Sequence, residues 1–540
     1  MKRAHLLAFS LALACEQTAE TSGPPSRSFL PMVALDNSVA FVDSSSGTTF
    51  LLDPADPALK PRIVATGQSP VKGGAVPHKG ANQLLVLTKG VQGDVDVEPE
   101  PARLVVVDPA SSAAVASYDL PGRYDSMAQS DDGAFAVLYY SESSQASGSM
   151  LFNPNDMAVV TFATGTVQTR PIRSLGGAPF DVKFSPPGAT LFGQPRNLAM
   201  IWAVNYVTLL DLDHGDRSEI TIPLSPDGKG SLKPAQVVFD LERQALYVRA
   251  TGSKDIFQIS LDPAAPLTAD ENDFRASVSL LGSGSEASDV QAFGTGDKMR
   301  LAATTSDSKP LVILNPATGS ATSVATGVPV NQIFVFNGPS PKSPAIEARA
   351  LLAGVGTNGL TLVFADLEEV ETKQGLALEN WALPHPVAQI TLLSGGFALL
   401  THSATYSGGT SFSIVNLADR TIEPIGSSGT FNLATTEVAA PSRLWGTNGA
   451  DRIEYLDLAD HGRGRLFAGE VILDQTIKSI SPLAQPSADG IRYLVLGMDD
   501  PTDAKSVGYV TVLNADQPDR KGARSAYGFF LTDYLERGTP

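Results

Sequence analysis

Short runs of apolar residues separated by turn residues cover most of the chain. Residues 103–140 read as an apolar run, an Asp-Pro turn, an alternating run, a Pro-Gly loop, a polar segment ending in Ser130-Asp-Asp-Gly133, and a last apolar run. Short apolar runs bounded by Gly, Pro, Asp and Ser are typical of β-strands, and Asp-Gly is a hairpin signal. We therefore expect residues 103–140 to form one small antiparallel sheet.

The same plan returns along the chain as a short apolar strand that ends in Asp or Asn. The strand ends are Asp43, Asp108, Asp211, Asp262, Asn315, Asp366, Asn416, Asp457 and Asn514, while residues 158–162 fit the strand but lack the acidic end. They recur about every 50 residues, a period found in propeller blades and in helical solenoids. Because one active site does not need so many copies, we interpret the Asp and Asn residues, Asp108 included, as turn-formers.

Residue content separates the two architectures. The repeats are rich in Val, Thr, Ser and Gly and show no helical period, which excludes helical repeats. Strands such as Leu104-Val-Val-Val107 are apolar at consecutive positions and must be covered on both faces. A ring of sheets stacked face to face does this, so we predict an all-β fold, a β-propeller of about eight to ten four-stranded antiparallel blades.

The turns and the ends of the chain predict how the ring is built. We expect the turns at residues 130–133 and 185–188 to join the third and fourth strands of a blade. Residues 32–36 read as the last strand of a unit, and residues 509–513 and 527–531 as first strands. The ring would then be closed by N- and C-terminal strands that complete one blade together.

Two longer spacings indicate insertions between strands. Residues 93–100 read as an acidic loop, and residues 263–275 as a short surface helix.

The units resemble the YVTN family of β-propeller repeats. That unit runs roughly Val-x-Val-Ile-Asp, a Thr-Gly turn, a strand, Ser-Pro-Asp-Gly and Val-Tyr-Val, and its nearest matches are Leu311-Val-Ile-Leu-Asn-Pro-Ala-Thr-Gly319 and Leu104-Val-Val-Val-Asp-Pro-Ala110. The resemblance is degenerate over most of residues 33–531. It implies a fold and does not specify a function.

The amino terminus has the form of a secretory signal. Lys2 and Arg3 precede an uncharged stretch over residues 4–14, which is too short to span a bilayer. The stretch ends in Leu11-Ala-Leu-Ala, and Cys15 comes directly after it. This resembles the lipobox of bacterial lipoproteins, with Ala12 where Leu is commonest. Cys15 is the only cysteine of the chain. The alternatives are an ordinary signal peptide with a chance cysteine, or a buried N-terminal helix.

The lipobox resemblance implies that Cys15 is lipidated and anchors the protein to a membrane, since several acyl chains give stable anchoring. It divides the chain into a signal peptide (1–14), a flexible tether (15–29) and a propeller domain (30–540). Glu16 in place of Asp favours the outer membrane of a bacterial cell envelope, on its periplasmic or surface face.

Composition and net charge limit the kinds of partner that the protein can bind. The 540 residues are 43% hydrophobic and 18% charged, which describes a folded protein, and the net charge is −18. Such a surface repels phosphate backbones, so we expect no nucleic-acid partner.

Residues with obvious chemistry are few. Beyond His5 in the signal, the histidines are His78, His214, His385, His402 and His461, and their turn-like settings predict surface positions. No hydrolase elbow, zinc signature, cysteine pair or phosphate loop occurs. The sequence therefore names no catalytic residue, no metal ligand and no cofactor site.

Two acidic stretches are candidate calcium sites. Asp211-Leu-Asp-His-Gly-Asp216 and Asp457-Leu-Ala-Asp-His-Gly462 offer oxygen ligands at alternate positions, but the first has Ile222 where a calcium loop has its bidentate Glu. Turn formation is the favoured interpretation and a cation site the alternative.

Trp and Gly residues add no site. We expect Trp202, Trp381 and Trp445 to pack in the core, and Gly282-Ser-Gly-Ser285 to be a plain loop.

Three function hypotheses remain. The first is a membrane-anchored propeller that binds a protein or glycan partner through one end of the ring. The second is a metal-assisted enzyme of the lactonase or hydrolase kind, which needs carboxylates and a His converging on the centre of the ring. The third is a periplasmic sensor or structural module without a small ligand.

Overall fold

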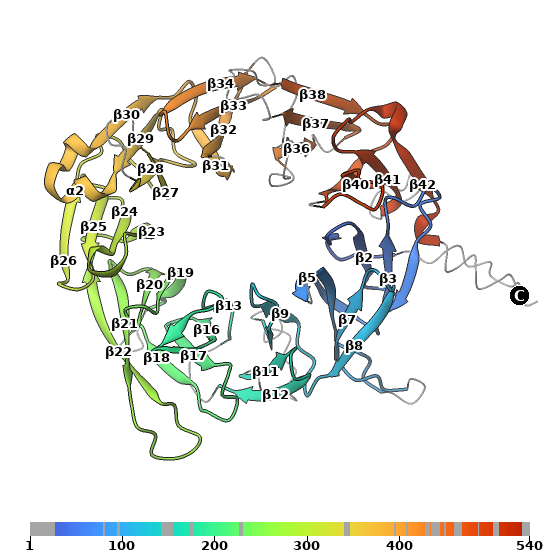
Figure 1. Cartoon of the computed structure of the whole chain (residues 1–540), viewed down its shortest axis with the longest axis horizontal. Helices are drawn as coiled ribbons and strands as arrows, with labels where there is room; N and C mark the ends of the chain where they lie inside the picture. The colour runs from blue at the N-terminus through green and yellow to red at the C-terminus, as the bar shows by residue number, and fades with distance from the viewer. Residues whose placement is uncertain are drawn as a thin grey trace, which may run out of the picture.

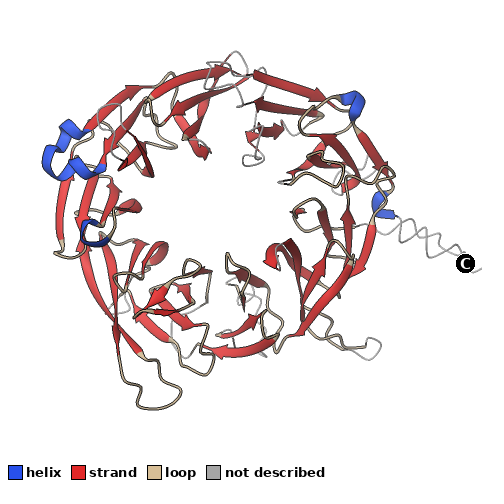
Figure 2. Cartoon of the chain, viewed as in Figure 1, coloured by secondary structure: helices blue, strands red, loops and turns tan. Residues whose placement is uncertain are grey.

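The chain forms a ring of ten four-stranded antiparallel sheets (Figure 1). The computed structural model describes residues 27–78, 81–93, 98–141, 153, 155–172, 178–225, 230–339, 346–393, 396–406, 409–426, 432–433, 443–447, 450–457, 467–483, 485–499 and 507–531. Strands make up almost all of the regular structure (Figure 2). The predicted all-β propeller is confirmed, and the sheets are called blades 1 to 10 in chain order.

The strands of each blade follow one another from the inner side of the ring to its outer side. Blades 1 to 3 contain β1 (Val33–Ala34), β2 (Val39–Asp43), β3 (Thr48–Leu52), β4 (Arg62–Ala65), β5 (Pro70–His78), β6 (Ala81–Thr88), β7 (Arg103–Asp108), β8 (Ala113–Asp119), β9 (Ser126–Gln129), β10 (Phe135–Tyr139), β11 (Asp156–Thr161) and β12 (Thr166–Pro171). Blades 4 to 6 contain β13 (Asp181–Phe184), β16 (Leu198–Ala203), β17 (Tyr206–Asp211), β18 (Ile220–Pro223), β19 (Lys233–Asp240), β20 (Ala245–Thr251), β21 (Asp255–Pro263), β22 (Phe274–Gly282), β23 (Ala287–Phe293), β24 (Arg300–Thr305), β25 (Leu311–Asn315) and β26 (Ser320–Val324). A small hairpin of β14 (Thr190–Leu191) and β15 (Gln194–Pro195) interrupts blade 4.

Blades 7 to 10 complete the ring. They contain β27 (Gln332–Pro339), β28 (Ile346–Ala353), β29 (Thr361–Asp366), β30 (Leu378–Ala382), β31 (Val387–Leu393), β32 (Phe397–Tyr406), β33 (Gly409–Asn416), β34 (Thr421–Gly426), β35 (Asn432–Leu433), β36 (Arg443–Thr447), β37 (Arg452–Asp457), β38 (Phe467–Ile472), β39 (Ile477–Pro482), β40 (Tyr493–Asp499), β41 (Val507–Asn514) and β42 (Arg524–Tyr527). The helical pieces are α2 (Leu367–Lys373), η1 (Gly296–Lys298), η2 (Gln374–Ala377), η4 (Arg520–Gly522) and η5 (Phe529–Leu531).

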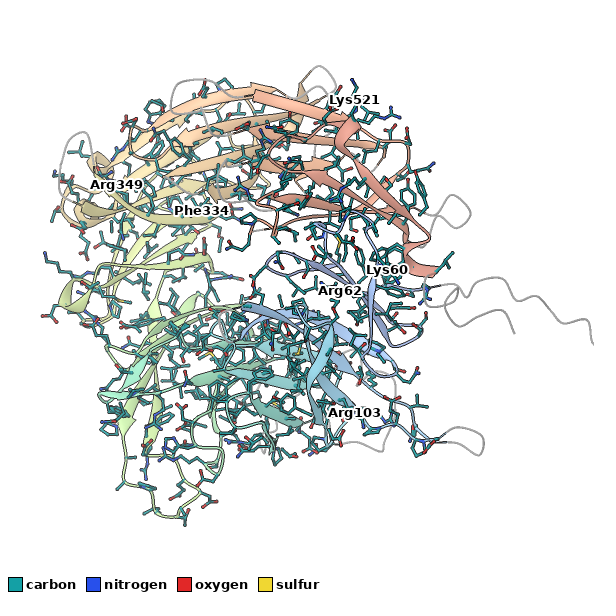
Figure 3. The ribbon with its side chains drawn as sticks, turned by 45° about the vertical axis from the view of Figure 1, so that its right-hand side comes forward. Lys60, Arg62, Arg103, Phe334, Arg349 and Lys521 are labelled. Carbon is teal, nitrogen blue, oxygen red and sulfur yellow. The ribbon has the colours of Figure 1, made fainter. Side chains whose placement is uncertain are left out.

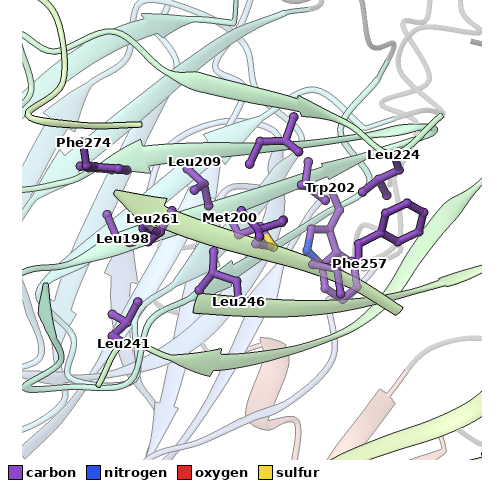
Figure 4. Close-up of a cluster of buried hydrophobic side chains, with 14 of the residues drawn as sticks. Leu198, Met200, Trp202, Leu209, Leu224, Leu241, Leu246, Phe257, Leu261 and Phe274 are labelled. Atoms are coloured by element: carbon purple, nitrogen blue, oxygen red, sulfur yellow. The ribbon is translucent and has the colours of Figure 1, made fainter. Parts of the chain in front are cut away.

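The core lies in the joints between neighbouring blades. Every residue of β16 is buried, although successive side chains of a strand point to opposite faces. Met200 and Trp202 pack against blade 5 in the cluster of Figure 4, whereas Ile201 packs against blade 3. Strands with consecutive apolar residues are therefore the ones sandwiched between two blades, as the sequence predicts.

The two faces of the ring differ in their connections. We call the face with the first-to-second and third-to-fourth strand turns the turn face, for example residues 130–133 and 109–112. We call the other face the loop face, because it carries the second-to-third strand loops, such as residues 306–310, and the blade-to-blade connections, such as residues 325–331.

The chain enters the ring on the loop face. Phe29 forms a bridge with Asp43, and Ser44 N donates to the Ser28 carbonyl at 2.7 Å, so the segment before β1 runs along the loop-face end of β2. Arg27 Nη1 lies 2.8 Å from Asp43 Oδ2.

The expectation that residues 103–140 form one sheet is wrong. β7 and β8 are the third and fourth strands of blade 2, and β9 and β10 are the first and second of blade 3. The predicted unit is thus shifted by two strands from the structural blade. A connection that leaves a blade carries the same kinds of residue as one that turns within it, so local sequence cannot distinguish the two.

The turn at Ser130-Asp-Asp-Gly133 consequently joins first and second strands, not third and fourth. Ser130 Oγ accepts from the backbone N–H groups of Ala134 and Phe135 at 3.1 and 3.0 Å. Gly133 has φ +69°, and a Cβ there would lie 1.9 Å from the Pro77 carbonyl oxygen. Only glycine fits this turn.

One repeat was assigned to the wrong strand. β2, which ends at Asp43, is the second strand of blade 1, and the equivalent of Asp108 is Asp53 after β3. Asp53 Oδ1 accepts from Ala55 N at 2.9 Å and Asp108 Oδ1 from Ala110 N at 3.1 Å, which is the same turn. The apolar run of β2 is as buried as that of β3, so burial pattern alone does not separate them.

No blade mixes strands from the two ends of the chain, contrary to expectation. Blade 1 is wholly N-terminal and blade 10 wholly C-terminal, and the ring closes where these two blades pack face to face. Residues 529–531, expected as a strand, form η5, whose Phe529 and Phe530 fill this joint. Their rings contact the Phe41 ring edge to face, with centroids 5.9 and 5.1 Å away. Buried aromatic area replaces strand pairing as the closing contact.

The predicted helix at residues 263–275 is also absent. This segment is the long connection between β21 and β22, and it leans on blade 4, where the Ser218 N–H donates to the Asp270 carbonyl at 2.6 Å. The only α-helix in the described part is α2, which buries Leu367 and Val370 against blade 7. No helix in these residues has the length and apolar character needed to cross a membrane.

Candidate binding groove

A cavity of about 720 Å³ lies on the inner wall of the ring at blades 5 to 8. It is lined mainly by the first strands of four consecutive blades, β19, β23, β27 and β31. We call it the inner groove. The size is within the usual range for small-molecule sites.

A repeated β-bulge shapes this wall. The register of β19, β23 and β31 shifts at the same place, leaving Ala235, Ser288 and Ala388 as the extra residues. All three line the inner groove and are exposed. A bulge bends its strand and re-aims the next side chain, here Gln236, Asp289 and Gln389.

Two of these side chains cap the inner strand of the following blade. Gln236 Oε1 accepts from Val290 N at 3.0 Å, and Asp289 Oδ2 accepts from Ile333 N at 2.8 Å. The first strand of a blade has an unpaired edge, so its backbone N–H groups need such partners. The caps therefore link blade 5 to 6 and blade 6 to 7.

Arg249 completes the polar network. Its Nε donates to Gln236 Oε1 at 3.1 Å and its Nη1 to the Ala287 carbonyl at 3.2 Å. Burial lowers the pKa of Arg249, and the negative charges of Asp289 and Glu286 oppose this shift. The positively charged Arg249 and the negatively charged Asp289 lie in the same wall, so the groove carries no large net charge.

The blade 7 to 8 end of the groove is different. Gln332 is half-buried and Gln389 exposed, and neither side chain makes a hydrogen bond with any described residue. Phe334, half-buried on β27 at the inner side of the wall (Figure 3), lies in the same lining. This end offers two amide side chains beside an aromatic ring.

A second cavity of about 460 Å³ adjoins the inner groove on the loop face. It is lined by the loops of residues 306–310 and 325–331, and it shares Ser288 and Asn331 with the inner groove. The two cavities therefore adjoin at blades 6 and 7, one on the inner wall and the other on the loop face.

The acidic stretch at 211–216 is an ion-pair network. Asp211 is 1% exposed, and its carboxylate lies 2.5 Å from Arg196 Nη1 and 3.3 Å from Arg217 Nη1. Burial alone would lower the pKa of Arg196, but Asp211 and Asp273 raise it above its ordinary value. Asp211 Oδ1 also accepts from the backbone of Asp213 at 3.0 Å, which makes it the predicted turn-former. Arg196 and Arg217 therefore occupy the positions beside the Asp211 carboxylate that a metal cation would need.

Three other predicted turn residues behave in the same way, whereas Asp262 lies within β21 and the side chain of Asp366 makes no cap hydrogen bond to α2. Asn315, Asn416 and Asn514 each accept a backbone N–H two residues ahead, at 3.0, 3.0 and 2.8 Å. Hydrogen bonds from Ser111 lower the pKa of Asp108. These residues lie on the turn face, away from the second cavity.

His402 is not on the surface as expected. It is 3% exposed on β32, with Nε2 2.8 Å from Ser413 Oγ and Nδ1 3.3 Å from the Pro386 carbonyl. Burial lowers its pKa. The side chain of His214 is 40% exposed and lies 2.9 Å from Asp211, and half-buried His385 stacks edge-on against His402 at 5.9 Å. No group of three His, Cys, Asp or Glu side chains suited to a metal occurs among the described residues.

The remaining candidates divide into core residues and residues outside the description. Trp202 and Trp445 are buried as predicted, Trp381 is half-buried against the joint of blades 7 and 8, and residues 283–286 form a plain connection. Cys15, His461 and residues 458–462 of the second acidic stretch lie outside the described residues, as do the side chain of His78 and residues 94–97 of the acidic loop.

Sequence reasoning missed the residues of the inner groove. A signal existed, because a Gln or Asp followed by Val or Ile recurs at Asp181, Gln236, Asp289, Gln332 and Gln389. Each stands in the first strand of a blade. These residues are spaced along the chain much as the Asp-ended strands are. A polar residue beside an apolar one is ordinary in a half-exposed strand, so the pattern indicates a site only once the arrangement of the ring is known.

Comparisons with known proteins yield distant likenesses in structure. No protein-family model matches the chain, and no curated protein matches it. Among solved structures, the chain is similar to the dihydro-heme d1 dehydrogenase NirN in complex with DHE, at 9% identity and TM-score 0.40, over 68% of this chain and 72% of that one. It is also similar to a eukaryotic initiation factor, at 12% identity and TM-score 0.42 over 75% and 90%, and to apo AztD from Citrobacter koseri, at 12% and 0.31 over 69% and 92%. Likenesses this remote carry no argument about function, which must come from the site.

Proposed function

We propose that the protein is a membrane-anchored cell-envelope lipoprotein whose propeller binds a partner, a protein or a glycan, through the inner groove. The observation that carries the binding role is the cavity at blades 5 to 8, where the side chains of Gln332 and Gln389 make no hydrogen bond with any described residue. A second cavity adjoins it on the loop face. Concave sites with a few placed polar groups are the usual ligand sites of folded proteins.

The anchor rests on the sequence. Leu11-Ala-Leu-Ala-Cys15 follows a basic and then apolar stretch, and the only thiol of the chain stands where a lipoprotein carries its lipid. Under this proposal residues 1–14 are removed and residues 15–29 tether the ring to the bacterial outer membrane. The YVTN-like repeats and the bacterial origin belong to the same proposal.

Membrane fractionation tests the anchor. Cys15→Ser should move the protein from the membrane to the soluble fraction, while Ser28→Ala, beyond the lipobox, should leave it in the membrane. Equal membrane retention of Cys15→Ser and the parent protein contradicts the lipoprotein assignment.

Site-directed photocrosslinking in cells tests the binding role. A photoreactive residue at Ala388, exposed in the inner groove, should give a discrete adduct, whereas one at Leu376, 90% exposed on η2, should not. Absence of any adduct from Ala388 contradicts binding through the groove.

A further inference from the structure

The blade 7 to 8 end of the inner groove breaks the pattern set by its neighbours. Gln236 caps Val290 N, and Asp289 caps Ile333 N, each across a joint to the next blade. Gln332 is the equivalent residue of blade 7, since it precedes Ile333 as Asp289 precedes Val290. Its side chain makes no hydrogen bond with any described residue.

The matching N–H on blade 8 belongs to Ile390. Val290 pairs with Ala303 two positions after the extra residue Ser288, and Ile390 pairs with Leu400 two positions after the extra residue Ala388. Alternate residues of an edge strand point their N–H groups away from the ladder, so Ile390 has its N–H on the inner side as Val290 does. The joint therefore presents a backbone donor, an unengaged amide at Gln332 and, one residue before Ile390, the amide of Gln389.

From this arrangement we propose that the blade 7 to 8 end of the inner groove binds a neutral saccharide. This deepens the proposed binding function and rests on it. Primary amides and sugar hydroxyls each carry both donors and acceptors, so they satisfy one another without charge. Phe334 supplies an apolar ring surface beside these amides, suited to the C–H face of a sugar ring.

Charge and backbone geometry favour a saccharide over two other ligands. Arg249 is engaged by Gln236 and balanced by Asp289, so no free cation is available for a phosphate or carboxylate in this wall. A peptide adding as a strand needs a row of free edge groups, but bulges interrupt β19, β23 and β31, and side chains cap the inner edges of blades 6 and 7.

Binding of uncharged oligosaccharides tests the proposal. The full chain, purified in a zwitterionic detergent without a sugar headgroup, is applied to an array of hexose and N-acetylhexosamine oligosaccharides, with acidic glycans and peptides as further arms. The strongest neutral binder is then titrated by calorimetry against Gln332→Ala and Gln389→Ala, with Gln517→Ala as control. Gln517 is an exposed glutamine on the turn face.

Loss of one neutral hydrogen bond should weaken binding about 3- to 10-fold in each groove variant and leave Gln517→Ala unchanged. Three results would each overturn the proposal: no neutral binder at millimolar concentration, a stronger response to acidic glycans or peptides, or an affinity of both groove variants that equals that of the parent protein. If the Ala388 adduct formed in cells contains protein and no sugar, the proposal of a saccharide ligand is wrong, but the proposed binding function of the groove is not contradicted.

Discussion

Arg524 of blade 10 donates through Nη1 to the Asp56 carbonyl of blade 1 at 3.0 Å, and through Nη2 to the Pro54 carbonyl. The acceptors belong to the connection between β3 and β4, on the turn face. The contact joins two blades that lie at opposite ends of the sequence.

The same kind of contact, an arginine hydrogen bond between neighbouring blades, recurs around the ring. In the described residues an arginine side chain bonds across eight of the ten joints, with Arg62 bonding to Ala110, Arg170 to Gly215, Arg196 to Asp273, Arg243 to Gly296, Arg300 to Glu371, Arg420 to Glu379, Arg443 to Asp516 and Arg524 to Asp56. The joint that closes the ring is therefore built like the joints within the chain. Arg62 is one of the labelled side chains of Figure 3.

Arg524→Ala should lower the free energy of unfolding by about 1–3 kcal/mol, because two backbone carbonyls lose a charged donor. Arg520→Ala is the matched control, since Arg520 pairs with Asp474 on the surface, where both side chains are more than half exposed and the pair contributes little. Urea unfolding measures both. Equal midpoints for Arg524→Ala and the parent protein would show that the arginine does not hold the joint.

Phe530→Ala should cost about 3–5 kcal/mol, the usual range for an aromatic side chain removed from a core. Phe530 is 2% exposed, and its ring centroid lies 4.5 Å from that of Phe29 and 5.5 Å from that of Phe50. Leu376→Ala, at an exposed position, should change the unfolding midpoint very little. A small effect of Phe530→Ala would mean that the closing joint tolerates a cavity.

Asp211→Ala should destabilise the protein by about 3–5 kcal/mol, because it leaves buried Arg196 without its closest carboxylate. Asp216→Ala, at an exposed position of the same loop, serves as control. Addition of a chelator should leave the melting temperature of the parent protein unchanged, since arginines fill the pocket around Asp211. A chelator-dependent loss of stability that disappears in Asp211→Ala would instead indicate a cation.

Acidification should destabilise the protein through His402. Its native pKa lies below the ordinary value of 6.5, so as pH falls through 6.5 the unfolded chain binds a proton that the native state does not. Stability is full above this pH and falls below it, by at most about 1.4 kcal/mol per pH unit for this group. The Pro386 carbonyl can only accept, so Nδ1 donates to it and Nε2 accepts from Ser413, the neutral arrangement that a second proton would disrupt.

His402→Gln should remove this component of the pH dependence. Unfolding free energies measured between pH 5 and pH 8 give the slope for both proteins. An unchanged slope in the variant would assign the effect to other groups.

The sequence predicts the ring and many of its turns, because burial on both faces and Asp or Asn at strand ends are local properties. Asp108 and Asn315 each form the expected turn. The assignment of strands to blades is not local, since β8 and β9 are neighbours in sequence but belong to different sheets.

The groove is harder still to predict. Gln236 and Asp289 acquire their roles from bulges and from N–H groups on the next blade, some 50 residues away. His402 gives a similar lesson, because its burial comes from blade neighbours that its polar surroundings in sequence do not reveal.

The entry of the chain beside Asp43 sets a geometric limit on what can reach the groove. Arg27 follows Cys15 by 12 positions, a stretch that spans at most about 40 Å when fully extended. With a lipid on Cys15, Arg27 would stay within that distance of the bilayer, so the loop-face end of β2 would lie near the membrane. A partner that approaches the inner groove from the loop face would then have to fit into the space that this short tether leaves.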